Sequence, residues 1–73
     1  MTVIVNTANK GTVNLRAEPM KNSKILAQVP NKTSLEAEYF DNTWSKVIYN
    51  GQLGYIMTEF LSNNKSITKN DLQ

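Results

Sequence analysis

The clearest pattern in this chain is a pair of strand-like runs joined by the dipeptide Asn50-Gly51. Residues 43–49 and 52–57 are rich in β-branched and aromatic side chains, which favour extended structure. Asn and Gly both tolerate the positive φ that a two-residue type I′ turn requires. The pattern therefore predicts a β-hairpin with its turn at these two residues.

The pairing within this hairpin follows from the position of its turn. Counting back from the turn pairs Val47 with Gly54 and Lys46 with Tyr55, and side chains alternate between the two faces. One face then carries Ser45, Val47, Tyr49, Gly54 and Ile56, and the other carries Trp44, Lys46, Ile48, Leu53, Tyr55 and Met57. If the first face covers a core, the second presents aromatic side chains beside a lysine, an arrangement that suits recognition.

Shorter alternating or β-branched runs, separated by turn-forming residues, occupy the rest of the chain. We expect strands at residues 2–6, 13–16, 25–29 and 34–40. In the last of these, Leu35, Ala37 and Tyr39 share one face. The predicted core consists of Val13, Leu15, Val29, Leu35, Ala37, Val47 and Ile56. Short strands at this spacing in 73 residues predict an all-β fold, and a small barrel suits the length better than a sandwich.

The end of the chain has a different character. We expect the barrel to occupy residues 1–62 and residues 63–73 to form a polar tail. Thr68 and Asp71 have the spacing of a helix-capping box, although Asp replaces the preferred Glu or Gln. The tail is either the frayed start of a truncated helix or a disordered segment.

The amino-acid composition of the chain argues against several classes of function. The chain has no Cys and no His, so it lacks a disulfide framework, a thiolate nucleophile and the usual general base near neutral pH. A net charge of +2, from 8 basic and 6 acidic residues, is too small for an electrostatic nucleic-acid binder. The sequence contains neither a signal peptide nor an apolar run of about 18 residues. We expect a non-enzyme that uses no cofactor or metal and binds neither nucleic acid nor a membrane.

Several spaced motifs resemble the bacterial Src-homology-3 family over residues 2–62. They are Val13-Asn14-Leu15-Arg16 with Pro19, then Ser23-Lys24-Ile25, then the segment from Trp44 to Ile56 with its Asn50-Gly51 turn, and finally Phe60-Leu61. The resemblance implies an SH3-like barrel of five to seven short strands with a single 3-10 turn near residues 58–61. It also implies a non-catalytic module, often attached to cell-wall hydrolases or surface proteins, that binds peptidoglycan or its peptide bridges. Glu18 stands where the family often has Gly, and the turn at residues 30–33 lacks the usual Gly.

Five residues are candidates for a ligand surface on the outward face of the hairpin and its rim: Trp44, Tyr55, Asn14, Arg16 and Glu18. Trp and Tyr offer stacking faces, and binding surfaces favour Trp, Tyr and Arg. Each also has a structural interpretation. Trp44 can pack over the neighbouring strand, which we favour. Arg16 can be held by a loop carbonyl or by Glu18, and Asn14 can make a local turn hydrogen bond. Glu36 and Glu38 lie on a short strand and are interpreted as part of a solvated face, not as a catalytic pair.

Two functional hypotheses follow. In the preferred one, the chain is a binding module that recognises peptidoglycan or a cell-wall peptide and targets an attached partner. The module would then act at the cell wall or outside the cell as part of a larger exported protein. The alternative is a structural or assembly subunit, such as a phage virion component or a protein–protein adaptor, which is phage-encoded or cytoplasmic.

Overall fold

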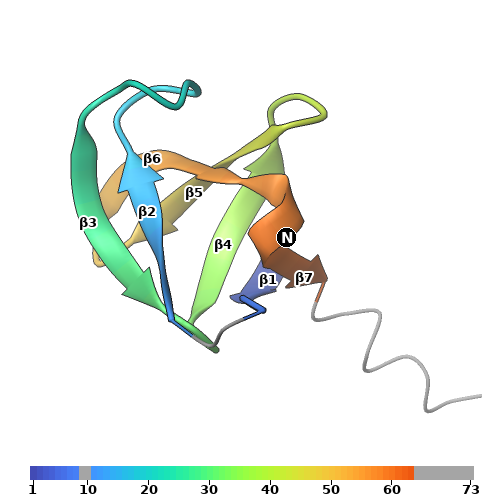
Figure 1. Cartoon of the computed structure of the whole chain (residues 1–73). Coiled ribbons are helices and arrows are strands. Elements are labelled where there is room, and N and C mark those ends of the chain that lie inside the picture. Colours follow the sequence, from blue (N-terminus) through green and yellow to red (C-terminus); the bar gives the residue numbers. More distant parts are fainter. Residues whose placement is uncertain (9–10, 64–73) are drawn as a thin grey trace, which may run out of the picture.

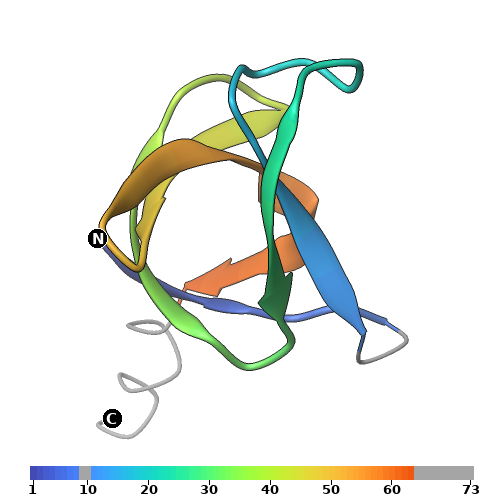
Figure 2. The same ribbon diagram turned by 90° about the vertical axis from the view of Figure 1, so that its left-hand side faces the viewer.

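The computed structural model describes residues 1–8 and 11–63, and in these residues the chain forms seven strands and one 3-10 turn (Figure 1). The elements are β1 (Thr2–Val5), β2 (Thr12–Arg16), β3 (Ile25–Pro30), β4 (Ser34–Tyr39), β5 (Trp44–Tyr49), β6 (Gln52–Met57), η1 (Thr58–Phe60) and β7 (Leu61–Asn63). All neighbours are antiparallel, in the order β3-β2-β6-β5-β4-β1-β7. Figure 2 shows how this sheet curls round on itself. The predicted small all-β barrel with a single 3-10 turn is confirmed.

The β5–β6 hairpin has the predicted register. Val47 lies opposite Gly54, Lys46 opposite Tyr55, and the turn residues have positive φ values of 52° and 79°. Gly54 is required for a steric reason. A Cβ at this position would lie 2.7 Å from Leu15 Cδ1 and 2.9 Å from the Arg16 carbonyl oxygen, because β2 runs close beside β6 here.

The core contains every residue that the sequence placed there. Each of these side chains is at most 5% exposed: Val13, Leu15, Val29, Leu35, Ala37, Val47 and Ile56. Strand β1 adds Val3 and Val5, to which the sequence pattern assigned no face. The alternation of apolar and polar positions was therefore sufficient to identify the inward face of four of the strands.

Tyr39, which the sequence placed on the same face as Leu35 and Ala37 but not in the core, is not buried with them. Leu35 and Ala37 point inward as expected, but Tyr39 is 68% exposed. It is the last residue of β4, and its hydroxyl donates a hydrogen bond of 2.8 Å to Asn42 Oδ1 in the turn that follows. The end of the strand thus lies beyond the core, and the ring is held by the turn.

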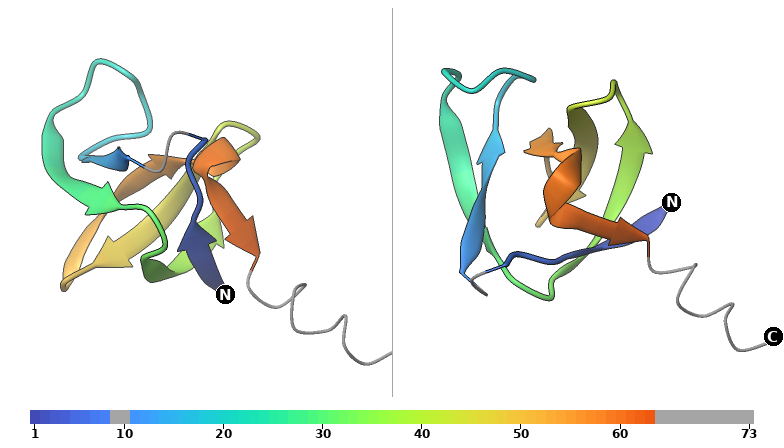
Figure 3. Two further views of the ribbon diagram at one scale, coloured as in Figure 1. Left: turned by 60° about the horizontal axis from the view of Figure 1, so that its bottom comes forward. Right: turned by 45° about the vertical axis from the view of Figure 1, so that its right-hand side comes forward.

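The last described strand extends to Asn63, one residue past the expected boundary of the barrel. Figure 3 shows β7 beside β1, and the pairing joins Val3 to Asn63 and Val5 to Leu61. The rest of the predicted tail, including the capping-box spacing at Thr68 and Asp71, lies outside the described residues. No helix within residues 1–8 and 11–63 is long and apolar enough to cross a membrane.

Candidate functional site

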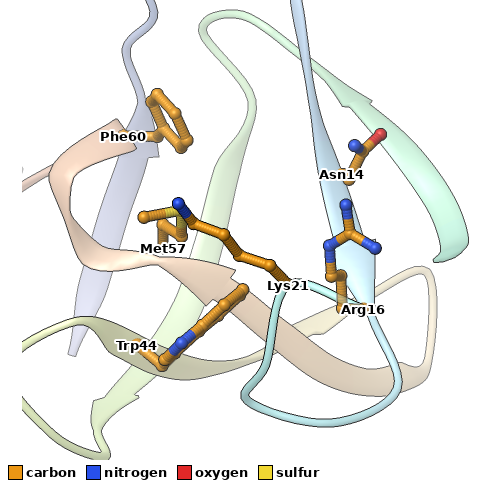
Figure 4. Close-up of a pocket in the computed structure, with 6 residues that line it drawn as sticks. All are labelled: Asn14, Arg16, Lys21, Trp44, Met57 and Phe60. Carbon is orange, nitrogen blue, oxygen red and sulfur yellow. The ribbon is translucent and has the colours of Figure 1, made fainter. Parts of the chain in front are cut away.

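A pocket of about 210 Å³ opens between the β2–β3 loop, η1 and the start of the hairpin (Figure 4). Its walls come from five elements that are distant in sequence but adjacent in the barrel. The lining residues are Asn14, Arg16, Lys21, Trp44, Met57 and Phe60. Three of the five candidates from the sequence, Asn14, Arg16 and Trp44, are thus brought together.

Trp44 is the first residue of β5 and lines the pocket, yet only 6% of its surface is exposed. The packed position that the sequence analysis favoured for Trp44 is therefore confirmed, although the residue belongs to the outward face of the hairpin. Met57 lies directly opposite Trp44, and η1 begins at the next residue, with the Thr58 N–H donating to the Thr43 carbonyl at 2.8 Å. Trp44 is not a member of the main core cluster, so it is buried separately, beside the pocket. The structural interpretation of Trp44 and its place at a binding site are compatible.

Arg16 ends β2, and its side chain is fixed by the loop that follows. Its Nη1 donates a hydrogen bond of 2.8 Å to the carbonyl oxygen of Ser23. The Ser23 hydroxyl oxygen lies 2.9 Å from the carbonyl oxygens of both Glu18 and Met20, so the loop is itself tied together. The sequence left a loop carbonyl and Glu18 open as partners for Arg16, and the structure shows the carbonyl.

Tyr55 and Glu18 do not line this pocket. The Tyr55 ring meets Phe40 edge to face, with centroids 5.3 Å apart and an interplanar angle of 74°. Glu18 is exposed in the β2–β3 loop, where its N–H donates to the Ser23 hydroxyl at 3.3 Å. A role for either residue in binding stays a prediction, and it would require a surface other than this pocket.

Sequence reasoning missed three of the lining residues: Lys21, Met57 and Phe60. Met57 could have been found, because the hairpin register places it opposite Trp44. Lys21 and Phe60 could not, since they lie in a loop and in a 3-10 turn whose positions depend on how the barrel closes. No periodic pattern in the sequence marks such residues.

Two further hollows adjoin this pocket and share lining residues with it or with each other, and we call the three together the Phe60 groove. The second, of about 340 Å³, is lined by Thr7, Ala8, Thr12, Val13, Asn14 and Phe60. The third, of about 400 Å³, is lined by Asn6, Thr7, Ala8, Glu59 and Phe60. Neighbouring hollows share residues, so the three lie side by side around Phe60, from Trp44 to Glu59. Its cations lie at the Trp44 end and its carboxylate at the other.

The lining of the groove mixes apolar and polar side chains, as ligand-binding sites commonly do. Its apolar contacts come from aromatic, methionine and alanine side chains, and its polar groups are amides, hydroxyls and a few charges. The Thr7 hydroxyl is buried in its wall without a hydrogen-bond partner among the described residues, an uncommon state for a polar group. In the described part of the chain, no three His, Cys, Asp or Glu residues gather in a way that could hold a metal ion.

Comparison with known proteins agrees with the fold. Residues 11–62 match the sequence model of the bacterial SH3 domain family, which is well over half of the chain. The chain therefore belongs to the bacterial SH3 domain family, as its motifs suggested. Domains of this family are generally non-catalytic binding modules, and membership suggests the same general class of function for this chain. A search of curated proteins finds no match.

Proposed function

We propose that this domain binds peptidoglycan or a cell-wall peptide in the Phe60 groove and thereby carries an attached partner to the wall. The observation that supports this proposal most directly is the row of adjacent hollows around Phe60, since an elongated ligand needs an elongated site. Apolar atoms of such a ligand would lie on Phe60 and on the walls beside it. Its amides would exchange hydrogen bonds with Asn6 and Asn14, which line different hollows of the groove.

The expected affinity is modest. The groove lies on a small domain, and binding must overcome the loss of translational and rotational freedom. A wall offers many copies of the same ligand, and a tethered second module raises the effective concentration of each partner. A weak site is therefore sufficient for targeting when the domain is part of a longer exported protein.

Co-sedimentation with purified peptidoglycan from several bacteria tests the proposal. We expect the wild-type domain to pellet with at least one preparation, and Asn14→Ala to pellet less. Asn22→Ala is the matched control, because Asn22 is exposed in the β2–β3 loop and does not line the groove. Folding of each variant is checked by circular dichroism.

Tyr55→Ala separates the groove from the outward face of the hairpin. If this folded variant loses binding and Asn14→Ala retains it, the ligand lies on the outward face and the groove is not the site. If the wild-type domain stays in the supernatant with every wall preparation, wall targeting fails.

One observation favours the alternative of a structural or assembly subunit. Ile48 and Leu53 face each other across the hairpin and are 51% and 54% exposed, on the side of the sheet away from the core. Together with Met1, Glu36, Ala37, Glu38 and Lys46 they line a separate hollow of about 360 Å³. Light scattering of the purified domain, with Ile48→Ser as the variant, measures whether this face joins copies of the chain.

A further inference from the structure

We infer that the Trp44 end of the Phe60 groove is a carboxylate site, which takes the free carboxyl end of a peptide. Arg16 and Lys21 bind the carboxylate, and the apolar walls receive the small side chain next to it. This inference rests on the proposed function, in that it names which part of a wall peptide the groove recognises. The observations behind it are the charge, the fixed geometry and the size of this pocket.

The charged side chains that line the pocket are all cationic. Two cationic side chains, Arg16 and Lys21, line it, and neither Asp nor Glu does. Glu18 belongs to the same loop as Lys21 but is exposed and outside the lining. Glu59 lines only the far end of the groove. An anion placed in this pocket therefore meets two cations and no facing carboxylate.

Arg16 is prepared to receive a carboxylate. The bond from its Nη1 to the Ser23 carbonyl holds the guanidinium in place and uses one of its several N–H donors. The planar guanidinium matches a carboxylate in a two-bond geometry, and such charge-assisted bonds are among the strongest in proteins. Because the loop already fixes this side chain, little rotamer freedom is lost on binding.

Lys21 supplies the second charge from the other side. It is exposed in the β2–β3 loop, and Figure 4 shows its side chain extending across the pocket towards Met57 and Phe60. A flexible ammonium group in this position can close over an anion that Arg16 has already oriented.

The size of the pocket limits what accompanies the carboxylate. At about 210 Å³ it is smaller than the roughly 300–1,000 Å³ of sites for drug-sized ligands. It suits a single terminal residue, with its side chain against Trp44 and Met57. A peptide that ends in D-alanine, as in a cell wall, and an ordinary L-peptide terminus share this chemistry, so the experiment must separate them.

Trp44 provides the readout, because it is the only tryptophan in the chain and lines the pocket. We would titrate the domain with N-acetyl-D-alanyl-D-alanine, with its C-terminal amide, and with N-acetyl-L-alanyl-L-alanine, following the fluorescence of Trp44. The acid is expected to bind saturably and at least about tenfold more tightly than the amide, as the loss of a charge-assisted bond predicts. Tighter binding of one stereoisomer identifies the source of the peptide.

A pair of lysine variants tests whether the preference for the acid over the amide arises in this pocket. Lys21→Gln should weaken binding of the acid several-fold and leave binding of the amide unchanged. Lys24→Gln makes the same change of charge at another exposed position near the end of the β2–β3 loop, outside the lining of the pocket, and should have little effect. Both side chains are exposed, so neither substitution threatens folding.

The outcomes distinguish this inference from the proposed function. Equal binding of acid and amide, or equal losses in the two lysine variants, overturns the carboxylate site, and so does the absence of any saturable change in fluorescence or in amide NMR shifts. If peptidoglycan still sediments the domain in those cases, the proposed function stands alone. If the acid binds through Lys21 but no wall preparation sediments the domain, the carboxylate site stands and wall targeting fails.

Discussion

Gly54 is the residue at which the barrel tolerates least change. A methyl group there would lie 2.7 Å from Leu15 Cδ1 and 2.9 Å from the Arg16 carbonyl oxygen, and Leu15 is fully buried. We expect Gly54→Ala to lower the free energy of unfolding by roughly 1–3 kcal/mol, because overpacking forces side chains and backbone to shift. Chemical denaturation measures this loss. Gly51→Asn is the control, since Asn accepts the positive φ of the turn. Equal denaturation midpoints for Gly54→Ala and the wild-type protein would contradict the close approach of β2 and β6.

At the scale of the element, the turn between β4 and β5 depends on one side chain. Asp41 Oδ1 accepts hydrogen bonds from the N–H groups of Thr43 at 2.8 Å and Trp44 at 2.7 Å. Asp41→Ala removes the acceptor for both, which we expect to cost about 1–3 kcal/mol of unfolding free energy and to shift the fluorescence of Trp44. Asp41→Asn keeps a side-chain oxygen in place and should recover most of the loss. Identical melting temperatures for the two variants would show that these bonds do not hold the turn.

The hairpin and the pocket differ in how far they could be predicted from the sequence. The hairpin was predictable in register because its turn chemistry and its alternation are local, and they are encoded in consecutive residues. The pocket was predictable only in part. Trp44 and Arg16 carry recognisable chemistry, whereas Lys21 and Phe60 reach the site through the closure of the barrel. Tyr39 shares the alternation of Leu35 and Ala37 but is exposed, because the strand ends there.

At the scale of the whole molecule, the first two residues of the chain bind Glu36 of strand β4 by a hydrogen bond and an ion pair. The Thr2 hydroxyl donates to Glu36 Oε2 at 2.8 Å, and the Met1 ammonium lies 3.2 Å from Oε1. The Thr2 bond first, and the ammonium second, lower the pKa of Glu36 below its ordinary value. A carboxylate whose pKa is lower in the folded state stabilises the fold above its ordinary pKa. This stabilisation is lost as the pH falls through the lowered pKa.

We therefore expect part of the loss of stability in acid to come from Glu36. Thermal melting at a series of pH values between about 7 and 3 should show a shallower acid decline for Glu36→Gln than for the wild-type protein, because the amide does not titrate. The effect is expected to be small, since the group is exposed and screened by solvent. Glu38→Gln is the matched control on the same exposed side of β4. An unchanged acid decline in Glu36→Gln would exclude this contribution.

The pairing of β1 with β7 also determines how the domain responds to mechanical tension. Val3 lies opposite Asn63 and Val5 opposite Leu61, so a pull through Met1 and Asn63 acts on the same end of this antiparallel pair. Bonds between antiparallel strands run perpendicular to the strands, and such a pull loads them one at a time. Tension would break the hydrogen bonds between β7 and β1 in sequence, starting at the pulled end. A pull on opposite ends of the pair would instead shear the strands and load all the bonds at once. The domain would yield to a stretched tether at low force, beginning at its last described strand.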